Sequence, residues 1–133
     1  MKKFISNILL LIVAILLATL LLPIGFVFGF FASFFDSKLK NGFYYFGENC
    51  RSIAYSIDQL GNTTCAHLFN HTLIKRKEGY LYGNPDETIS GVTGKNKIKG
   101  TLTKTGMLLD CILESFEENH SELAIENDEQ IKN

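Results

Sequence analysis

Two histidines and three later or neighbouring residues could bind a metal ion. His67 and His71 are four residues apart, so on a helix their imidazoles lie on the same face. Cys65, Cys111 and His120 could complete a site if the last helix of the chain packs beside the helix that carries His67 and His71. Neutral imidazole and thiolate suit the borderline-soft Zn²⁺. We therefore formulate a zinc hypothesis on His67, His71, Cys111 and His120. The spacing matches no established zinc motif, and the simpler interpretation is surface histidines and small core cysteines.

Four acids, Asp58, Asp86, Glu87 and Asp110, could act as general acids or bases or bind Mg²⁺. Asp86 and Glu87, however, are residue types expected at the start of a helix. Asp110 is expected on an acidic, solvent-facing side of another helix. The chain contains no G-x-S-x-G and no P-loop sequence. We predict no enzymatic activity and no cofactor apart from the zinc alternative.

An uncharged segment makes up the first quarter of the chain. Residues 4–35 contain no charged side chain and hold seven of the eleven phenylalanines. The first apolar run, residues 4–22, exceeds the ~7–15 residues of a signal-peptide h-region, and no A-x-A cleavage site follows it. The segment is therefore predicted to be an uncleaved membrane anchor, covering residues 1–35.

The length of this segment leaves two arrangements open. A helix of 32 residues is ~48 Å long, against a hydrocarbon core of ~30 Å. Pro23 and Gly25 mark the place for a kink or break. We favour one tilted or kinked span whose Phe-rich end lies at the interface. The alternative is a hairpin in which residues 24–35 return, although twelve residues are too few for a second full span.

The orientation in the membrane is open. Lys2 and Lys3 flank one end of the segment and Lys38 and Lys40 the other, which is close to a tie under the positive-inside rule. Three cysteines cannot all pair within one chain, which favours a reducing cytoplasm only weakly.

The rest of the chain is predicted to be mainly helical. Residues 36–49, rich in Gly and aromatics, are expected to form a juxtamembrane linker. Residues 50–120 are expected to form a small helical domain, with helices over 50–60 and 64–74 separated by a stop at Gly61. A short helix should begin with Asn84 as N-cap and Pro85 in the first position, and end at once because Gly91 and Gly94 follow.

The last helix should run from Thr103 or Thr105 to Asn119. Its apolar stripe, expected to face the core, consists of Leu108, Leu109, Ile112, Leu113 and Phe116. Residues 121–133 are predicted to be an acidic tail that frays after Ile125.

Charge argues against a nucleic-acid partner. Residues 107–133 carry eight acids against one lysine, and acids repel phosphate. The Lys95–Lys104 region is basic but lacks interleaved aromatics, so we interpret it as a solvated loop. The expected partners are the lipid bilayer and a protein, either another protein or a second copy.

Two sequence blocks carry a resemblance to known proteins. Residues 58–62 read D-Q-L-G-N and residues 83–90 read G-N-P-D-E-T-I-S. These blocks, with Leu109-Asp110 and Asn119-His120, resemble a family of small phage- and prophage-encoded proteins, often described as membrane proteins and commonly encoded near lysis genes. Those relatives join the two blocks more closely and often have Cys where this chain has Ser121. The resemblance implies a genomic context and no mechanism.

Anchor, domain and resemblance together predict a membrane-anchored phage or prophage accessory protein with a helical interaction domain, associated with host lysis or envelope modification. The expected location is a single-pass position in the bacterial inner membrane. The alternatives are a zinc-stabilised binding module and a holin-like permeabilising protein. We rank the holin lower because one and a half spans with a large polar domain do not suit a membrane lesion.

Overall fold

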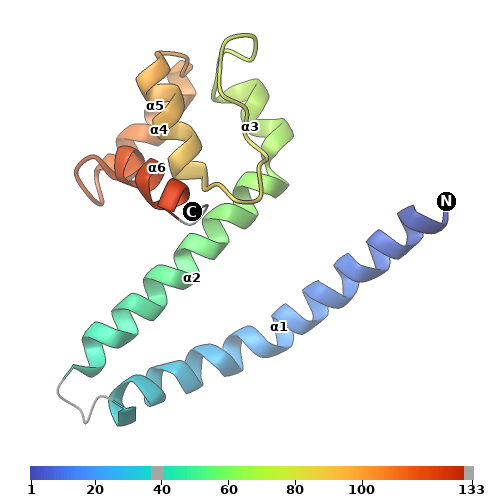
Figure 1. The fold of residues 1–133 in the computed structure, drawn as a ribbon, viewed down its shortest axis with the longest axis vertical. Coiled ribbons are helices and arrows are strands. Elements are labelled where there is room, and N and C mark those ends of the chain that lie inside the picture. Colours follow the sequence, from blue (N-terminus) through green and yellow to red (C-terminus); the bar gives the residue numbers. More distant parts are fainter. Residues whose placement is uncertain (37–40, 131–133) are drawn as a thin grey trace. The chain divides into compact units, whose positions relative to one another are not determined.

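The computed structural model describes residues 1–36 and 41–130 and shows six helices in these ranges (Figure 1). They are α1 (Lys2–Asp36), α2 (Gly42–Thr64), α3 (Ala66–Thr72), α4 (Ile89–Lys99), α5 (Lys104–Glu114) and α6 (His120–Gln130). These described ranges contain no strand beyond one isolated bridge. The predicted mainly helical fold, with one long apolar helix first, is confirmed.

The chain divides into two compact units, Met1–Arg51 and Ser52–Asn133. We call them the anchor unit and the helical unit. The boundary falls inside α2, so the first half of that helix belongs to the anchor unit and the second half to the helical unit.

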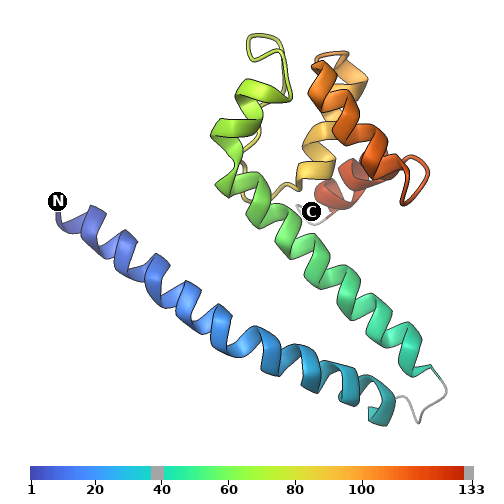
Figure 2. The ribbon, with the colours of Figure 1, turned by 180° about the vertical axis from the view of Figure 1, so that it is seen from behind.

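In the anchor unit, α1 is one continuous helix that runs through Pro23. It therefore does not turn back at Pro23, and the hairpin alternative within residues 4–35 is not formed. Over Lys2–Phe35 the helix is long and apolar enough to cross a membrane, and its most apolar stretch is not buried inside the protein. Figure 2 shows the length of α1 from behind.

The start of α2 packs against the Phe-rich end of α1. The ring of Phe46 lies 5.4 Å from that of Phe26 and 5.0 Å from that of Phe30, both in edge-to-face geometry. Phe43 and Phe34 make a third such pair at 4.9 Å. These aromatic contacts explain why residues 42–49 are helical rather than the linker predicted from their composition. Residues 37–40 of that predicted linker lie outside the described residues.

In the helical unit, a small apolar core joins α3, α4 and the segments around them. It consists of Leu73, Ile74, Tyr82, Val92 and Leu102. Helix α3 ends earlier than the predicted 64–74 helix because Ile74 instead forms an antiparallel bridge with Leu102. The backbone N–H of Lys75 donates to Thr101 O at 2.8 Å, and that of Thr103 donates to Leu73 O at 2.9 Å. Helix α2 also continues through Gly61, where a stop was predicted.

Helix α4 differs from the prediction at both ends. It begins at Ile89 with Thr88 as N-cap, whose Oγ1 accepts a bond from Gly91 N. Asn84 instead closes a turn, since its carbonyl accepts a bond from Glu87 N at 3.1 Å. The helix passes through Gly91 and Gly94 to Lys99, so the predicted solvated lysine loop is largely helical.

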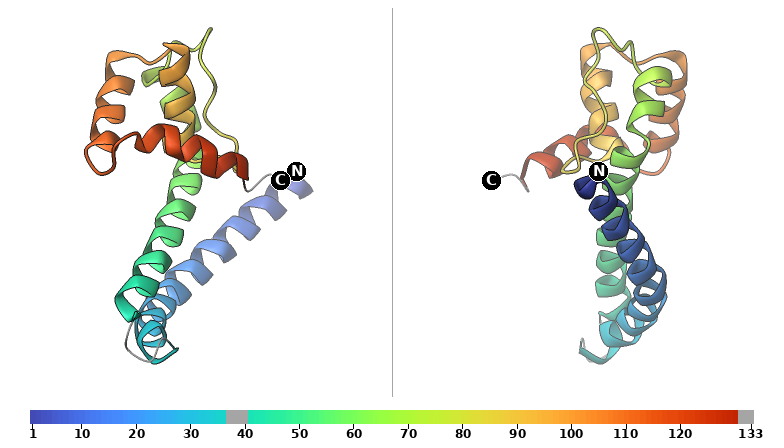
Figure 3. Two further views of the ribbon diagram at one scale, coloured as in Figure 1. Left: turned by 60° about the vertical axis from the view of Figure 1, so that its left-hand side comes forward. Right: turned by 90° about the vertical axis from the view of Figure 1, so that its right-hand side faces the viewer.

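The glycines of α4 allow α6 to cross it closely (Figure 3). A Cβ at Gly94 would collide with the backbone carbonyl of Ser121, and a Cβ at Gly91 with the carboxylate of Asp128. On α6, Ser121, Ala124 and Asp128 are buried. The tail predicted to fray is therefore a packed helix over residues 120–130, while residues 131–133 lie outside the described residues.

Helix α5 turns only part of its predicted stripe inward: Leu109 packs against the core and Leu113 is half-buried. Thr103 caps it as expected, but the helix ends at Glu114 rather than at Asn119, which has a left-handed φ of 59°. Asp110, expected in solvent, is buried, whereas Leu108 and Phe116, expected in the core, are exposed. Two contacts fix this orientation of α5. Asp110 accepts a bond from the Ser121 hydroxyl at 2.8 Å, and Gly106, which has no Cβ, lets the helix backbone lie against Leu73 O.

Candidate functional site

The four residues of the zinc hypothesis lie on three helices. His67 and His71 are both exposed on α3. Nδ1 of His71 lies 2.7 Å from His67 O, and its Nε2 lies 3.0 Å from Arg76. Cys111 is exposed on α5, and His120 begins α6.

His120 is occupied by a carboxylate, since its Nδ1 lies 3.1 Å from Glu117. Among the described residues, no three His, Cys, Asp or Glu side chains are close enough to hold a metal ion. The zinc site stays a prediction.

The interior of the helical unit is rich in polar side chains, and α4 lies at its centre. The buried polar or charged residues are Asn62, Glu87, Thr88, Ser90, Thr93, Asn96, Thr101, Asp110, Ser121 and Asp128. Buried polar groups cost free energy unless they are hydrogen-bonded. The packing of this unit therefore depends on specific bonds as well as on apolar contact.

Asp128 ties the end of α6 to the start of α4 and to α2. Its carboxylate is fully buried and accepts three bonds, from the Tyr55 hydroxyl at 2.7 Å, from Thr88 N at 3.0 Å and from Thr88 Oγ1 at 3.1 Å. Because Thr88 caps α4, the negative charge also lies at the positive end of that helix dipole. Burial, followed by the bond to Asp128, raises the pKa of the Tyr55 phenol.

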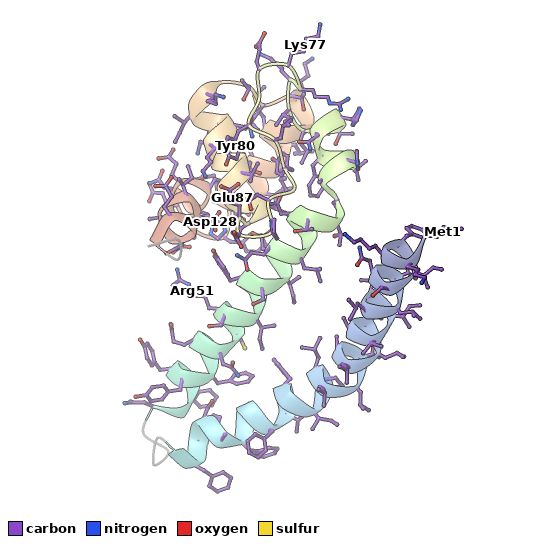
Figure 4. The ribbon with its side chains drawn as sticks, turned by 45° about the vertical axis from the view of Figure 1, so that its right-hand side comes forward. Met1, Arg51, Lys77, Tyr80, Glu87 and Asp128 are labelled. Atoms are coloured by element: carbon purple, nitrogen blue, oxygen red, sulfur yellow. The ribbon has the colours of Figure 1, made fainter. Side chains whose placement is uncertain are left out.

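Glu87 fixes the turn before α4 to the helix itself. Its side chain is 1% exposed, and its Oε1 lies 2.9 Å from Lys95 Nζ and accepts a bond from the Tyr80 hydroxyl at 2.9 Å. Lys95 also lies 4.8 Å above the Tyr80 ring. Figure 4 labels Tyr80, Glu87 and Asp128 in the helical unit, and Lys77 at the tip of the loop after α3. Sequence reasoning missed this role of Glu87, because it had assigned the residue to a helix start.

The two sequence blocks that carry the family resemblance bond to each other. Nδ2 of Asn62 donates to Asn84 O at 2.9 Å and to Glu87 O at 2.7 Å, and Gly83 N donates to Asn62 Oδ1 at 3.0 Å. One turn earlier on α2, Asp58 accepts bonds from the N–H and the hydroxyl of Ser90. The blocks thus form the two sides of one joint between α2 and α4.

A second charged cluster joins α4, α5 and α6. Lys97 Nζ lies 3.0 Å from Glu114, 3.5 Å from Asp110 and 3.6 Å from Glu122. The bond to Glu114 is the main cause that raises the pKa of Lys97, and the bond from Lys97 lowers the pKa of Glu114. Lys97, predicted to lie in a solvated loop, therefore joins α4 to α5 and α6.

Part of the exposed apolar surface of the helical unit lies on the outer side of α5 and in the turn after it. We call it the α5 stripe; it consists of Met107, Leu108, Cys111, Ile112 and Phe116, all exposed, with Phe116 81% exposed. Exposed apolar patches of this kind mark interaction sites more often than solvated surface. Leu108, Ile112 and Phe116 belong to the stripe that was predicted to face the core, whereas Met107 and Cys111 were not part of that prediction.

Comparison with protein-family models, curated proteins and solved structures finds no match to this chain.

Proposed function

We propose that this chain is a membrane-anchored interaction protein, in which α1 holds the chain in a lipid bilayer and the helical unit binds a protein. The observation that carries the proposal is the presence of two exposed apolar surfaces in one chain, α1 in the anchor unit and the α5 stripe in the helical unit. The resemblance of the two sequence blocks supports a phage or prophage accessory role in lysis or envelope modification.

Membrane attachment is tested by fractionation of the full chain expressed in a bacterium. We expect the protein to stay in membranes washed with alkaline carbonate and to leave them only in detergent. The double change Ile12→Lys with Leu16→Lys should release it, because each lysine at the centre of a span costs about 2.5–3.5 kcal/mol. Ile12→Leu with Leu16→Ile is the matched control. Release of the unchanged protein by carbonate would refute the proposal.

The side of the membrane determines which partners are possible. Cys111 is exposed on α5, so an impermeant maleimide should label it in intact cells only if the helical unit lies outside the cytoplasm. Cys111→Ser gives the background, and lysed cells give full labelling. External labelling supports a role at the envelope; labelling only after lysis directs the search to cytoplasmic partners.

A permeabilising role makes a different prediction. If expression of the full chain, with no other phage protein present, collapses the membrane potential, the chain acts as a holin-like protein and the interaction role is wrong. We expect the membrane potential to persist, because α1 is the one candidate span among the described residues. The buried polar networks lie in the helical unit and not in the anchor unit.

A further inference from the structure

We propose that the helical unit has a lipid-binding surface of its own, a basic end that docks on anionic phospholipid headgroups. The surface consists of five cations in the loop after α3, at the end of α4 and at the start of α5: Lys75, Arg76, Lys77, Lys99 and Lys104. We call this set the basic end. The inference goes beyond the proposed function, because it requires neither α1 nor the partner of the α5 stripe.

The fold brings these cations together from two parts of the chain. The isolated bridge aligns residues 71–78 with residues 98–105, and Lys99 Nζ lies 3.3 Å from Glu78 O across it. The two segments hold five Lys or Arg and one acid, Glu78. Figures 1 and 2 show the loop after α3 and the α4–α5 connection at one end of the helical unit, away from α6 and from the turn after α5.

The charge of the basic end is not neutralised within the part of the chain that the structure describes. All five cations are exposed, and none lies within ion-pair distance of a described carboxylate, whereas Lys95 and Lys97 of the same α4 do. The ends of α3 and α4 each add at most about half a negative charge, and the start of α5 adds about half a positive one. After Glu78 is subtracted, a charge of about +3.5 remains for a partner.

The acids nearest to α4 lie on its other side. Lys97 and Lys99 are two residues apart, so their side chains leave the helix about 200° apart. Lys97 faces the carboxylates of Asp110, Glu114 and Glu122, whereas Lys99 reaches the loop after α3. A flat anionic surface at the basic end therefore meets lysines and an arginine rather than the acids around Lys97.

The chemistry of the basic end favours phospholipid headgroups over nucleic acid. Clusters of roughly four to eight Lys or Arg are typical of surfaces that bind anionic lipid. Ile98, next to Lys99, is 70% exposed and supplies an aliphatic side chain that can enter the headgroup region. Residues 71–78 and 98–105 contain no Phe, Tyr or Trp, the side chains on which unpaired bases stack.

The test uses the full chain held in phosphatidylcholine nanodiscs and measures flotation with separate vesicles. We expect the discs to float with phosphatidylcholine vesicles that contain about a third phosphatidylglycerol, and to stay behind with phosphatidylcholine alone. Flotation should decline as salt is raised toward about 1 M, where the Debye length is only about 3 Å. Equal flotation with the two kinds of vesicle would overturn the inference.

Lys75→Gln with Lys77→Gln removes two of the five charges, both from exposed side chains. Because each cation near an anionic surface strengthens binding about fivefold, vesicle binding should weaken about 25-fold. Lys75→Arg with Lys77→Arg keeps both charges and should bind like the unchanged chain. Adding Asp86→Asn and Glu118→Gln, two exposed acids, to the glutamine variant restores the net charge elsewhere. Recovery of binding in that variant would show dependence on net charge alone and overturn the inference.

Two competitors distinguish headgroups from other phosphates. Inorganic phosphate, compared with chloride at equal ionic strength, should leave flotation unchanged, and displacement would indicate a site for a single anion instead. A labelled RNA or DNA oligonucleotide should bind the discs more weakly than the anionic vesicles do. Tighter binding of the oligonucleotide, lost in Lys75→Gln with Lys77→Gln, would assign the basic end to nucleic acid and overturn the inference.

The same samples separate this inference from the proposed membrane attachment. A chain that stays in the nanodiscs but does not float with anionic vesicles would contradict the lipid-binding basic end and leave attachment through α1 standing. A chain that leaves the nanodiscs, yet binds anionic vesicles through Lys75 and Lys77, would contradict attachment alone.

Discussion

At the scale of single residues, the helical unit depends on carboxylates and amides more than its composition suggests. Asn62, fully buried, satisfies two carbonyls and one N–H across the joint between α2 and α4. Asn96, also fully buried, accepts a bond from Tyr80 N through its Oδ1 and donates one to Tyr80 O through its Nδ2. Neither role can be predicted from residue type alone, because an asparagine in a sequence reads equally well as a cap or a turn.

Replacement of Asp128 tests the most buried of these carboxylates. Asp128→Asn keeps the shape but turns an acceptor toward Tyr55 and Thr88 into an NH₂ group. We expect a loss of about 2–4 kcal/mol in the free energy of unfolding, since bonds to a charged acceptor are lost and donors are left unpaired. Protease resistance of the helical unit across a urea series measures the loss. Asp86→Asn, an exposed acid, should change stability by less than about 0.5 kcal/mol.

The raised pKa of Tyr55 gives a pH dependence with a definite sign. The folded state holds the phenol proton more tightly than the unfolded state, whose pKa is about 10. The stabilisation is therefore fully present below pH ~10 and is lost as the pH rises through the higher folded value. Burial also raises the pKa of Tyr82, so both phenols contribute.

Tyr55→Phe should flatten this alkaline loss while lowering stability near neutral pH, because the bond to Asp128 disappears. Urea midpoints taken from neutral to strongly alkaline pH measure both effects. Tyr44→Phe, exposed on α2, serves as the control and should leave the curve unchanged. A Tyr55→Phe curve as steep as that of the unchanged protein would assign the alkaline loss to Tyr82 instead.

At the scale of elements, local signals predicted well which segments are helical, but predicted poorly which side of a helix faces the interior. The apolar run predicted α1, and Thr103 marked the start of α5. Gly91 and Gly94 were taken as breakers because glycine lowers helix propensity, yet both lie inside α4. Their reason is tertiary: α6 approaches where no Cβ intervenes. The inward side of α5 was predicted only in part. Leu109 packs against the core as expected. Asp110, expected in solvent, is buried because it bonds Ser121 and lies near Lys97, partners that the sequence pattern does not reveal.

Gly94→Ala tests the crossing of α4 and α6. The new methyl group would meet the backbone carbonyl of Ser121, which cannot move aside as a flexible side chain could. We expect a net loss of about 1–3 kcal/mol in stability, despite the higher helix propensity of alanine. Gly47→Ala in α2, where a Cβ meets nothing within 4 Å, should leave stability unchanged or slightly higher. Circular dichroism with the protease assay distinguishes loss of α6 docking from global unfolding.

At the scale of the whole molecule, the pairing of α1 with α2 limits how much of α1 can lie in lipid. The 35 residues of α1 rise about 52 Å, against a hydrocarbon core of about 30 Å. A Cβ at Gly29 would touch the amide of Asn49 on α2, and charged Glu48 and Arg51 flank that amide in the sequence. Because charged groups avoid the bilayer centre, the span should end before the stretch of α1 that pairs with α2, at about Pro23.

Thiol reactivity along α1 distinguishes this limit from a fully immersed helix. Leu16 and Phe35 are both exposed in the anchor unit, so protein packing shields neither. With Cys50, Cys65 and Cys111 changed to serine, Leu16→Cys should resist a water-soluble maleimide in membranes, while Phe35→Cys should react at least about tenfold faster, since thiolates form only where water reaches. Resistance at both positions would place the Phe-rich end in lipid and require α2 to leave α1. Fast reaction at both positions would contradict the proposal that α1 spans the membrane.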